Sequence, residues 1–438
     1  MRRWLRTVLR WMYPGMRIKR WILLAFGGSA LIVTGLMMLF GVEMVRNLYQ
    51  AVPESPWLRY VWIGSALLVG IVGFAVGLFF LFRSVARGVA PASRERASDL
   101  IYRTRVLESA PHVVAIGGGT GLSTLLRGLK EETANLTAVV TVTDDGGSSG
   151  RLRREMETLP PGDVRNCILA LAEDESRLSE LFQHRFTEPK ALAGHSLGNL
   201  VLVGLEQAAG GFDRAVEAMS QFLSVRGRVL PTTLADCQLV ATMEDGEQIQ
   251  GESTIVADAR LIADLRLSPS HVPAYTAVIE AILNAELLIL GPGSLYTSII
   301  PNLLVDGVVD AISESKAEKL LIANLMTQPG ETDHLSLRDH LRVLDRFMPV
   351  SRLDAILVNS AHPDASLLGG YLDEEAEPVV DDLGASNEYG VQILRADLVG
   401  TARWAGKETV KHSPRKLAKT IVDVTRAFSS TRRDLVTP

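Results

Sequence analysis

The feature that most constrains the fold is a repeated pattern in which a short apolar segment ends in a polar or glycine-rich loop. The apolar segments are residues 112–116, 136–142, 287–290, 319–324 and 353–359. Helical patterns near residues 163–173, 196–209 and 212–223 stand between them. Strands that alternate with helices in this way are typical of a parallel sheet covered by helices. The sequence therefore predicts an α/β, Rossmann-like domain over residues 111–438.

Residues 228–266 depart from this pattern. Apolar and polar residues alternate there, and the dipeptide Asp245-Gly246 is a turn signal. We predict a β-rich insertion in this segment. A basic helix near residues 414–427 is expected to close the domain.

Charge is distributed unevenly along the 438 residues. Residues 1–110 hold 15 Lys and Arg against 5 Asp and Glu, whereas the remaining residues hold 30 against 45. An acidic domain argues against nucleic-acid binding, which needs a basic face. The two cysteines, Cys167 and Cys237, exclude a disulfide framework and a four-cysteine metal site.

The basic N-terminal part predicts a membrane anchor. Residues 21–42 and 60–82 contain no charged side chain, and each segment is long enough to cross about 30 Å of hydrocarbon. Arginines and lysines lie before the first segment and after the second, so we expect a hairpin of two transmembrane helices within residues 1–82. Residues 83–110 would be a basic linker. The N-terminus and the C-terminal domain would both be cytoplasmic, in a multi-pass protein of the cell membrane.

A cleaved signal peptide is the alternative for the first apolar segment. That segment is too long for the apolar core of a signal peptide, and a second one follows it. We therefore favour the hairpin.

The first glycine loop, residues 117–121, is a candidate phosphate-binding turn. Glycines let the backbone approach a ligand, and the first amides of the next helix attract an anion. Leu122 departs from the G-x-G-x-x-G pattern, and the lysine of a P-loop is absent. The alternative is a plain strand–helix turn. The candidates here are Gly117, Gly118, Gly119, Thr120, Gly121 and Ser123.

The second loop begins with Asp144 and Asp145 at a strand end. Carboxylates suit a ribose hydroxyl or a divalent cation, so either residue is a candidate metal ligand. Neighbouring side chains on a strand point to opposite faces, so the two carboxylates cannot fully share one role. A solvated loop is the alternative. The loop adds four candidates, Gly146, Gly147, Ser148 and Arg151.

Further polar residues stand at predicted helix starts and strand ends. Asp163 is a natural N-cap. Residues 194–198 match the G-x-S-x-G pattern, but no strand precedes them, which argues against a serine hydrolase. His195 and Asn199 would share a helix face, and a structural role for His195 is equally open. The remaining candidates are Arg165, Asn166, His195, Asn199, Gly291, Gly293, Ser294, Tyr296, Asn324, Thr327 and Gln328.

Taken in order along the domain, these segments resemble the gluconeogenesis factor (YvcK-like) family, which is related to the 2-phospho-L-lactate transferases (CofD-like). The resemblance rests on residues 117–123, 144–153, 160–167, 194–200, 291–298 and 326–332. It implies a Rossmann-like domain that binds a UDP-sugar and regulates cell-wall precursor supply and cell shape. It also implies binding roles for Tyr371 and Lys411, although the family carries Arg at the latter position and Lys lacks its planar fork.

The sequence thus predicts a membrane-anchored, UDP-sugar-binding regulator. The alternative is an enzyme that moves a phospholactyl group from a nucleotide donor to a deazaflavin acceptor with Mg2+. A dinucleotide-dependent oxidoreductase is a third reading, which Leu122 weakens. The expected partners are the nucleotide ligand, the membrane and enzymes of cell-wall precursor synthesis, with a homo-oligomer as a further expectation. No cofactor other than Mg2+ is expected.

Overall fold

The computed structural model describes residues 110–258, 260–362, 376–384, 387–404 and 407–436, together with scattered residues of the first 107. The chain divides into two compact units, Met1–Val106 and Leu107–Pro438. Within the described residues, no helix has the length and apolar character needed to cross a membrane. The predicted hairpin and linker are described only in part: most of residues 21–42 and 83–110, and residues 63, 66, 67, 75 and 77–82 of the second segment, lie outside the described residues.

The second unit is built on a seven-stranded sheet. Its strands are β1 (Val113–Gly117), β2 (Leu136–Val140), β3 (Arg228–Pro231), β7 (Leu287–Leu290), β8 (Glu318–Ile322), β9 (Ala355–Asn359) and β10 (Gln392–Ala396). Their order is β10-β9-β8-β7-β1-β2-β3, and every neighbouring pair is parallel. The Rossmann-like parallel sheet predicted from the sequence is therefore confirmed.

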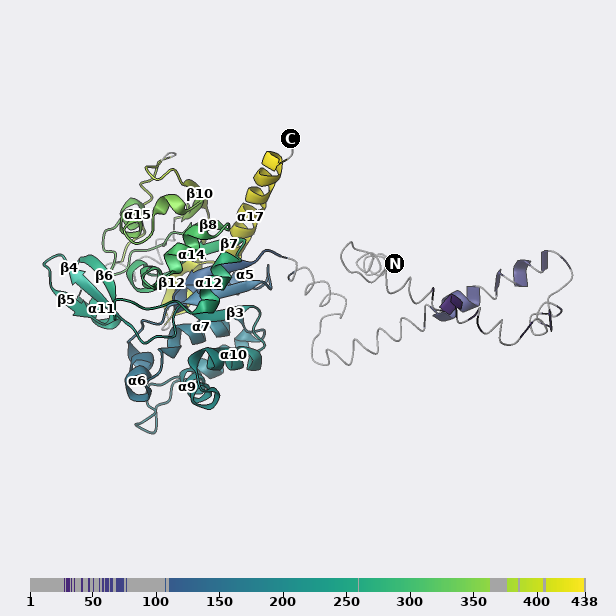
Figure 1. Ribbon diagram of the computed structural model, residues 1–438, viewed down its shortest axis with the longest axis horizontal. Helices are drawn as coiled ribbons and strands as arrows, with labels where there is room; N and C mark the ends of the chain where they lie inside the picture. The colour runs from purple at the N-terminus through teal and green to yellow at the C-terminus, as the bar shows by residue number, and fades with distance from the viewer. Residues whose placement is uncertain are drawn as a thin grey trace. The chain divides into compact units, whose positions relative to one another are not determined.

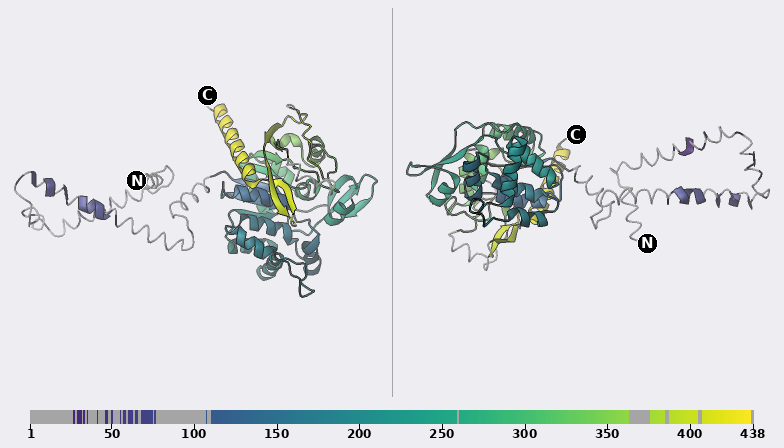
Figure 2. Two further views of the ribbon diagram at one scale, coloured as in Figure 1. Left: turned by 180° about the vertical axis from the view of Figure 1, so that it is seen from behind. Right: turned by 90° about the horizontal axis from the view of Figure 1, so that it is seen from below.

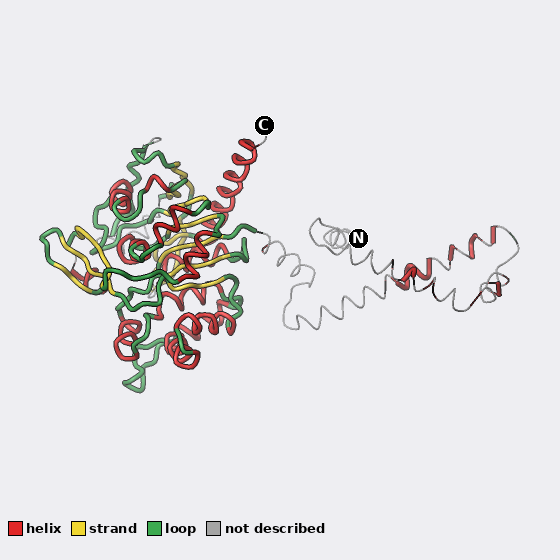
Figure 3. Tube along the Cα trace, in the orientation of Figure 1, coloured by secondary structure: helices red, strands yellow, loops and turns green. Residues whose placement is uncertain are grey.

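Helices surround this sheet, so its central strands are buried on both faces (Figures 1 and 3). All five residues of β1 are buried, as expected for a covered parallel strand. The helices are α5 (Gly119–Leu129), α6 (Gly147–Met156), α7 (Pro161–Leu171), α8 (Glu175–Gln183), α9 (Leu197–Ala209), α10 (Phe212–Phe222), α12 (Thr276–Leu283), α13 (Ile300–Leu303), α14 (Val308–Glu314), α15 (Leu337–Asp345) and α17 (Pro414–Val436). Leu295–Ile299 adds a π-helical turn and Val350–Arg352 a 3-10 turn.

The β-rich insertion is present, and its sheet spans Gln238–Ser268 where residues 228–266 were predicted. Strands β4 (Gln238–Met243), β5 (Gln248–Gln250) and β6 (Ile262–Ser268) form an antiparallel sheet, with α11 (Glu252–Asp258) beside it. It lies to one side of the main sheet (Figure 1). The predicted segment began too early, because Arg228–Pro231 is strand β3 of the main sheet, where its last three residues are buried.

The C-terminal part adds a hairpin and a long helix. Strands β11 (Val399–Trp404) and β12 (Lys407–His412) pair antiparallel. Helix α17 starts directly after them and packs against α5, where a Cβ built at Gly128 would overlap the carbonyl of Pro414. The far end of α17 extends from the domain (Figure 2). This connection brings β12 to the carboxyl end of the sheet beside α5.

The strand order creates a crevice beside β1. The chain runs from β1 to β2 and β3 on one side, and later returns to β7 on the other side. The connections that leave the carboxyl ends of β1 and β7 therefore diverge. Open α/β sheets bind ligands at such a switch point.

Candidate functional site

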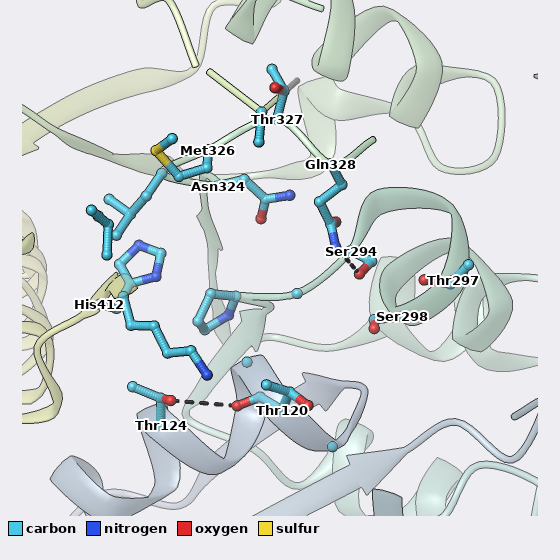
Figure 4. Close-up of a pocket in the computed structure, with 18 of the residues that line it drawn as sticks. Thr120, Thr124, Ser294, Thr297, Ser298, Asn324, Met326, Thr327, Gln328 and His412 are labelled. Atoms are coloured by element: carbon cyan, nitrogen blue, oxygen red, sulfur yellow. Dashed lines mark hydrogen bonds between the residues drawn. The ribbon is translucent and has the colours of Figure 1, made fainter. Parts of the chain in front are cut away.

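A cavity of about 470 Å3 opens at this switch point. Its walls come from the first turns of α5, from the segments after β7 and β8, from α7 and α11, and from β12. Figure 4 shows labelled residues of α5, of the segments after β7 and β8, and of β12 around the cavity. The lining residues are Gly119, Thr120, Gly121, Thr124, Asp163, Glu252, Pro292, Gly293, Ser294, Thr297, Ser298, Asn324, Leu325, Met326, Thr327, Gln328, Pro329, Ala376, Val410, Lys411 and His412. The cavity thus joins segments nearly 300 residues apart in the sequence.

The glycines of the first loop are required by packing between loops. A Cβ built at Gly121 would overlap the carbonyl oxygen of Pro292, and one built at Gly119 would overlap the Asp163 carboxylate. Asp163 accepts a hydrogen bond from the Gly119 amide. Thr120 and Gly121 of the first helical turn line the cavity. The start of α5 therefore presents backbone amides to a ligand, the arrangement that favours an anion.

The opposite wall carries amide and hydroxyl groups. Gln328 Nε2 donates to Ser294 Oγ at 2.7 Å. Gln328 Oε1 is buried and has no hydrogen-bond partner in the described part of the chain. Asn324 and Thr327 come from the same loop, which follows β8. Figure 4 shows these groups across the cavity from Thr120 and Thr124. Unpaired buried polar atoms are rare in proteins, so this wall is suited to a ligand that completes its hydrogen bonds.

Two carboxyl groups lie in the cavity wall, Asp163 and Glu252. Burial, followed by the negative charge of Asp144, raises the pKa of Asp163 to about 6. Burial raises the pKa of Glu252 well above its ordinary value, and Asp144 and Asp163 add to this effect. Lys411 contributes a cation, whose pKa is lowered by partial burial and then by Arg127. The cavity lining therefore combines two carboxyl groups with one basic side chain.

Neither predicted metal ligand lines the cavity. Asp144 Oδ1 accepts from the Gly146 amide at 2.9 Å, and burial is the main cause that raises the pKa of Asp144. Asp145 Oδ1 accepts from the Ser253 amide at 2.8 Å and so holds the start of α11. The two carboxylates therefore contact different groups: Asp144 bonds to the Gly146 amide and to the Ser149 side chain, and Asp145 bonds to the Ser253 amide. Among the described residues, no group of three or more His, Cys, Asp or Glu side chains could hold a metal ion.

Several other predicted residues form a separate buried cluster, which we call the Arg165 network. Arg165 donates to Asn199 Oδ1 at 2.6 Å and to Asn166 Oδ1 at 2.8 Å, and also to Ser196 Oγ. Ser148 Oγ lies 3.0 Å from both His195 Nδ1 and Asn199 Nδ2. Ser196 caps α9 by accepting from the Asn199 amide. The G-x-S-x-G serine is thus a helix cap, and the network satisfies most of its own hydrogen bonds.

The sequence candidates therefore fall into three groups. Those that line the cavity are Gly119, Thr120, Gly121, Gly293, Ser294, Asn324, Thr327, Gln328 and Lys411. Those outside its lining are Gly117, Gly118, Ser123, Asp144, Asp145, Gly146, Gly147, Ser148, Arg151, Arg165, Asn166, His195, Asn199, Gly291 and Tyr296. Tyr371 lies outside the described residues.

Sequence reasoning missed several lining residues. Asp163 was interpreted as an N-cap, yet it lies in the first turn of α7 and reaches across to α5. Glu252 belongs to the insertion, where no local pattern connects it with the glycine loops. His412 follows Lys411 at the end of β12, and only its position next to that residue could have drawn attention to it. Thr124 lies one turn after Thr120 on α5, so helical periodicity could have predicted it.

Comparison with known proteins places this domain in a family. The family model for the 2-phospho-L-lactate transferase CofD matches residues 113–399. A putative gluconeogenesis factor of Nostoc sp. is 42% identical, and the alignment covers 94% of this chain and 91% of the relative. The gluconeogenesis factor of Bacillus subtilis is 44% identical over 72% of this chain and 98% of the relative.

A solved structure supports the same assignment. The crystal structure of a Bacillus halodurans protein superposes with a TM-score of 0.68 at 43% identity, covering 72% of this chain and 100% of that one. This chain therefore belongs to the gluconeogenesis factor family and contains its CofD-like domain.

Proposed function

We propose that the cavity binds a UDP-sugar and that the protein uses this binding to regulate cell-wall precursor supply and cell shape. The observation that carries the proposal is the position of the cavity at the switch point, where the amides of α5 meet the polar loops after β7 and β8. Membership of the gluconeogenesis factor family supports a regulatory role.

The cavity offers a complementary group for each part of such a ligand. The diphosphate would lie against the first turn of α5, with Lys411 supplying a positive charge. The hydroxyls of ribose and sugar would meet Ser294, Asn324 and Gln328. The base would pack on the apolar side chains of the loop after β8. The proposed ligand therefore spans the cavity from its amide wall to its apolar wall.

We also propose that the N-terminal unit anchors the protein in the cell membrane, with the domain in the cytoplasm. The basis is the pair of uncharged segments flanked by arginines and lysines. The Nostoc alignment covers more of this chain than Leu107–Pro438 holds, so it extends into the first 106 residues. A reporter fused to the C-terminus that is active only outside the cytoplasm should stay silent. Activity of that reporter would contradict the topology.

A Mg2+-dependent transferase is the second candidate, and the carboxylates of Asp163 and Glu252 favour it. Mg2+ is commonly held by one or two carboxylates together with ligand phosphates and water. In that reading these residues would hold the ion, which would neutralise charge on the phosphates. Phospholactyl transfer to a deazaflavin by the wild-type protein, lost in Asp163→Asn with donor still bound, would establish the transferase in place of the regulator.

Calorimetric titration separates these functions. We expect UDP-N-acetylglucosamine to bind without Mg2+, and GDP and NAD to bind more weakly. Lys411→Ala should weaken binding by about tenfold, because a charge-assisted contact to phosphate is lost. Lys419→Ala is the matched control, since Lys419 is exposed on α17, and it should change nothing. Equal affinity of the two variants would contradict the proposed phosphate position.

A further inference from the structure

One wall of the cavity is apolar except for a single histidine. Leu325, Met326 and Val410 form a small buried cluster, and all three line the cavity. His412 lines the same cavity and is only 9% exposed. Figure 4 shows His412 on the opposite side of the cavity from Ser294 and Ser298. A flat ring that packs on this apolar wall would therefore lie beside the His412 side chain.

The hydrogen bonds of His412 determine which nitrogen carries the proton. The ring donates to the backbone carbonyl of Ala323. Nε2 is buried without a partner in the described part of the chain, so the donor to Ala323 is Nδ1. A neutral imidazole has one N–H and one acceptor nitrogen. Burial lowers the pKa of His412 to about 4, so the ring is neutral at physiological pH. Nε2 is therefore a fixed acceptor.

A buried acceptor without a partner costs free energy until a donor reaches it. We propose that His412 Nε2 accepts a hydrogen bond from the ring N–H of the bound nucleobase and thereby selects bases that carry such a group. This inference rests on the proposed function, because it assumes that the cavity binds a nucleotide.

The bases differ in whether the ring nitrogen that would face His412 carries a proton. Uracil carries N3–H and guanine carries N1–H, whereas cytosine and adenine have an unprotonated acceptor nitrogen at the corresponding position. Two acceptors that face each other lose the hydrogen bond and repel. A site built to accept from a ligand N–H discriminates strongly against an analogue that lacks it. His412 would thus admit uridine nucleotides and exclude cytidine nucleotides of the same size.

The test compares UDP with CDP, which share ribose and phosphates and differ only at the base edge. With the full-length chain, we expect UDP to bind at least about tenfold more tightly than CDP. In His412→Asn, the carboxamide nitrogen can replace Nδ1 as donor to Ala323, but no atom replaces Nε2. The preference should then fall to within about twofold. In His412→Gln, the carboxamide oxygen can replace the acceptor, and the preference for UDP should return.

His340→Asn is the matched control. His340 is also buried, its Nδ1 lies 2.8 Å from the carbonyl oxygen of Ser336, and its Nε2 has no partner among the described residues. It lies on α15 and does not line the cavity. This variant should keep the wild-type preference even if its stability changes. A preference unchanged in His412→Asn, or equal affinities of UDP and CDP for the wild-type chain, would overturn the inference while the cavity remains a nucleotide site. Failure of the wild-type chain to bind UDP-N-acetylglucosamine, UDP and GDP would overturn the proposed function and the inference together.

Discussion

The cavity and the Arg165 network look alike in the sequence and differ in their hydrogen bonding. Both contain hydroxyl and amide side chains together with one basic side chain, Lys411 or Arg165. In the Arg165 network, Ser148, Asn199 and Arg165 bond to one another. Among the described residues, Gln328 Oε1 and His412 Nε2 of the cavity lining are buried without a partner, and in the Arg165 network Arg165 Nε is the one such atom. The comparison teaches that polar composition alone indicates only a polar cluster, and that an unmet hydrogen bond points to a binding site only where the atom belongs to a residue that lines a cavity.

The largest effect is expected from a substitution that breaks the Arg165 network. Arg165→Met removes hydrogen bonds to Ser196, Asn199 and Asn166 and leaves the oxygen of the buried Asn199 side chain without its donor. We expect the free energy of unfolding to fall by about 3 kcal/mol, measured by urea denaturation. Arg177→Met on α8 is the control, because the Arg177 side chain is 87% exposed, and its effect should stay within about 0.5 kcal/mol. A stable Arg165→Met protein that no longer binds a UDP-sugar would make the network a ligand site instead.

The next effect concerns the contact between the loops that form the cavity. Gly121→Ala places a Cβ against the Pro292 carbonyl and should cost about 2 kcal/mol of unfolding free energy through overpacking. Gly204→Ala is the matched control, because Gly204 is exposed in α9 and nothing lies within 4 Å of its added Cβ. That variant should gain up to about 1 kcal/mol from helix propensity. Thermal unfolding of the two variants measures the difference, and equal midpoints would refute the packing role of Gly121.

A smaller effect separates structural from metal-binding carboxylates. Asp145→Ala removes the acceptor that holds the Ser253 amide at the start of α11. The loss resembles that of a helix cap, so we expect a cost of about 1 kcal/mol. The affinity for a UDP-sugar should have the same Mg2+ dependence as in the wild-type protein. A Mg2+ requirement that disappears in this variant would restore Asp145 as a metal ligand.

The smallest effect is a pH dependence of the cavity. Burial raises the pKa of Asp163 from its ordinary value of 3.8 to about 6, so its contribution to stability is present below about pH 3.8 and is lost as the pH rises through about 6. A UDP-sugar keeps two negative charges over this range and is repelled by the ionised carboxylate. Its affinity should therefore rise about threefold as the pH falls from about 7.5 to about 5.

The control for this pH effect is Asp163→Asn, which keeps an oxygen to accept from the Gly119 amide. Titrations at the two pH values should give the same affinity in the variant. Asp144 and Arg165 also influence the pKa of Asp163, and both are unchanged in this comparison. A pH dependence of wild-type size in Asp163→Asn would assign the effect to another group.

The sequence predicted the sheet well because buried parallel strands are apolar on both faces. The segments at residues 112–116, 287–290 and 353–359 all became strands of the main sheet. Strand β3 was assigned to the insertion because Arg228–Pro231 is short and stands next to an alternating pattern. The residues after Gly146 were expected to form a loop, but helix α6 begins at Gly147. Glycine is compatible with the start of a helix, so the glycines did not exclude one there.

By itself, the sequence determined the family, the α/β class and the loops at the strand ends, because apolar periodicity and glycine position are local properties. Tertiary structure alone decided which of those loops meet. Glu252 and His412 reach the cavity from an insertion and a late hairpin, and their neighbours there are distant in the chain. It also decided that Arg165 and Asn199 would bond to each other. The physical reason is that the hydrogen-bond balance of a buried polar atom depends on every segment packed around it, and one-dimensional spacing does not record that packing.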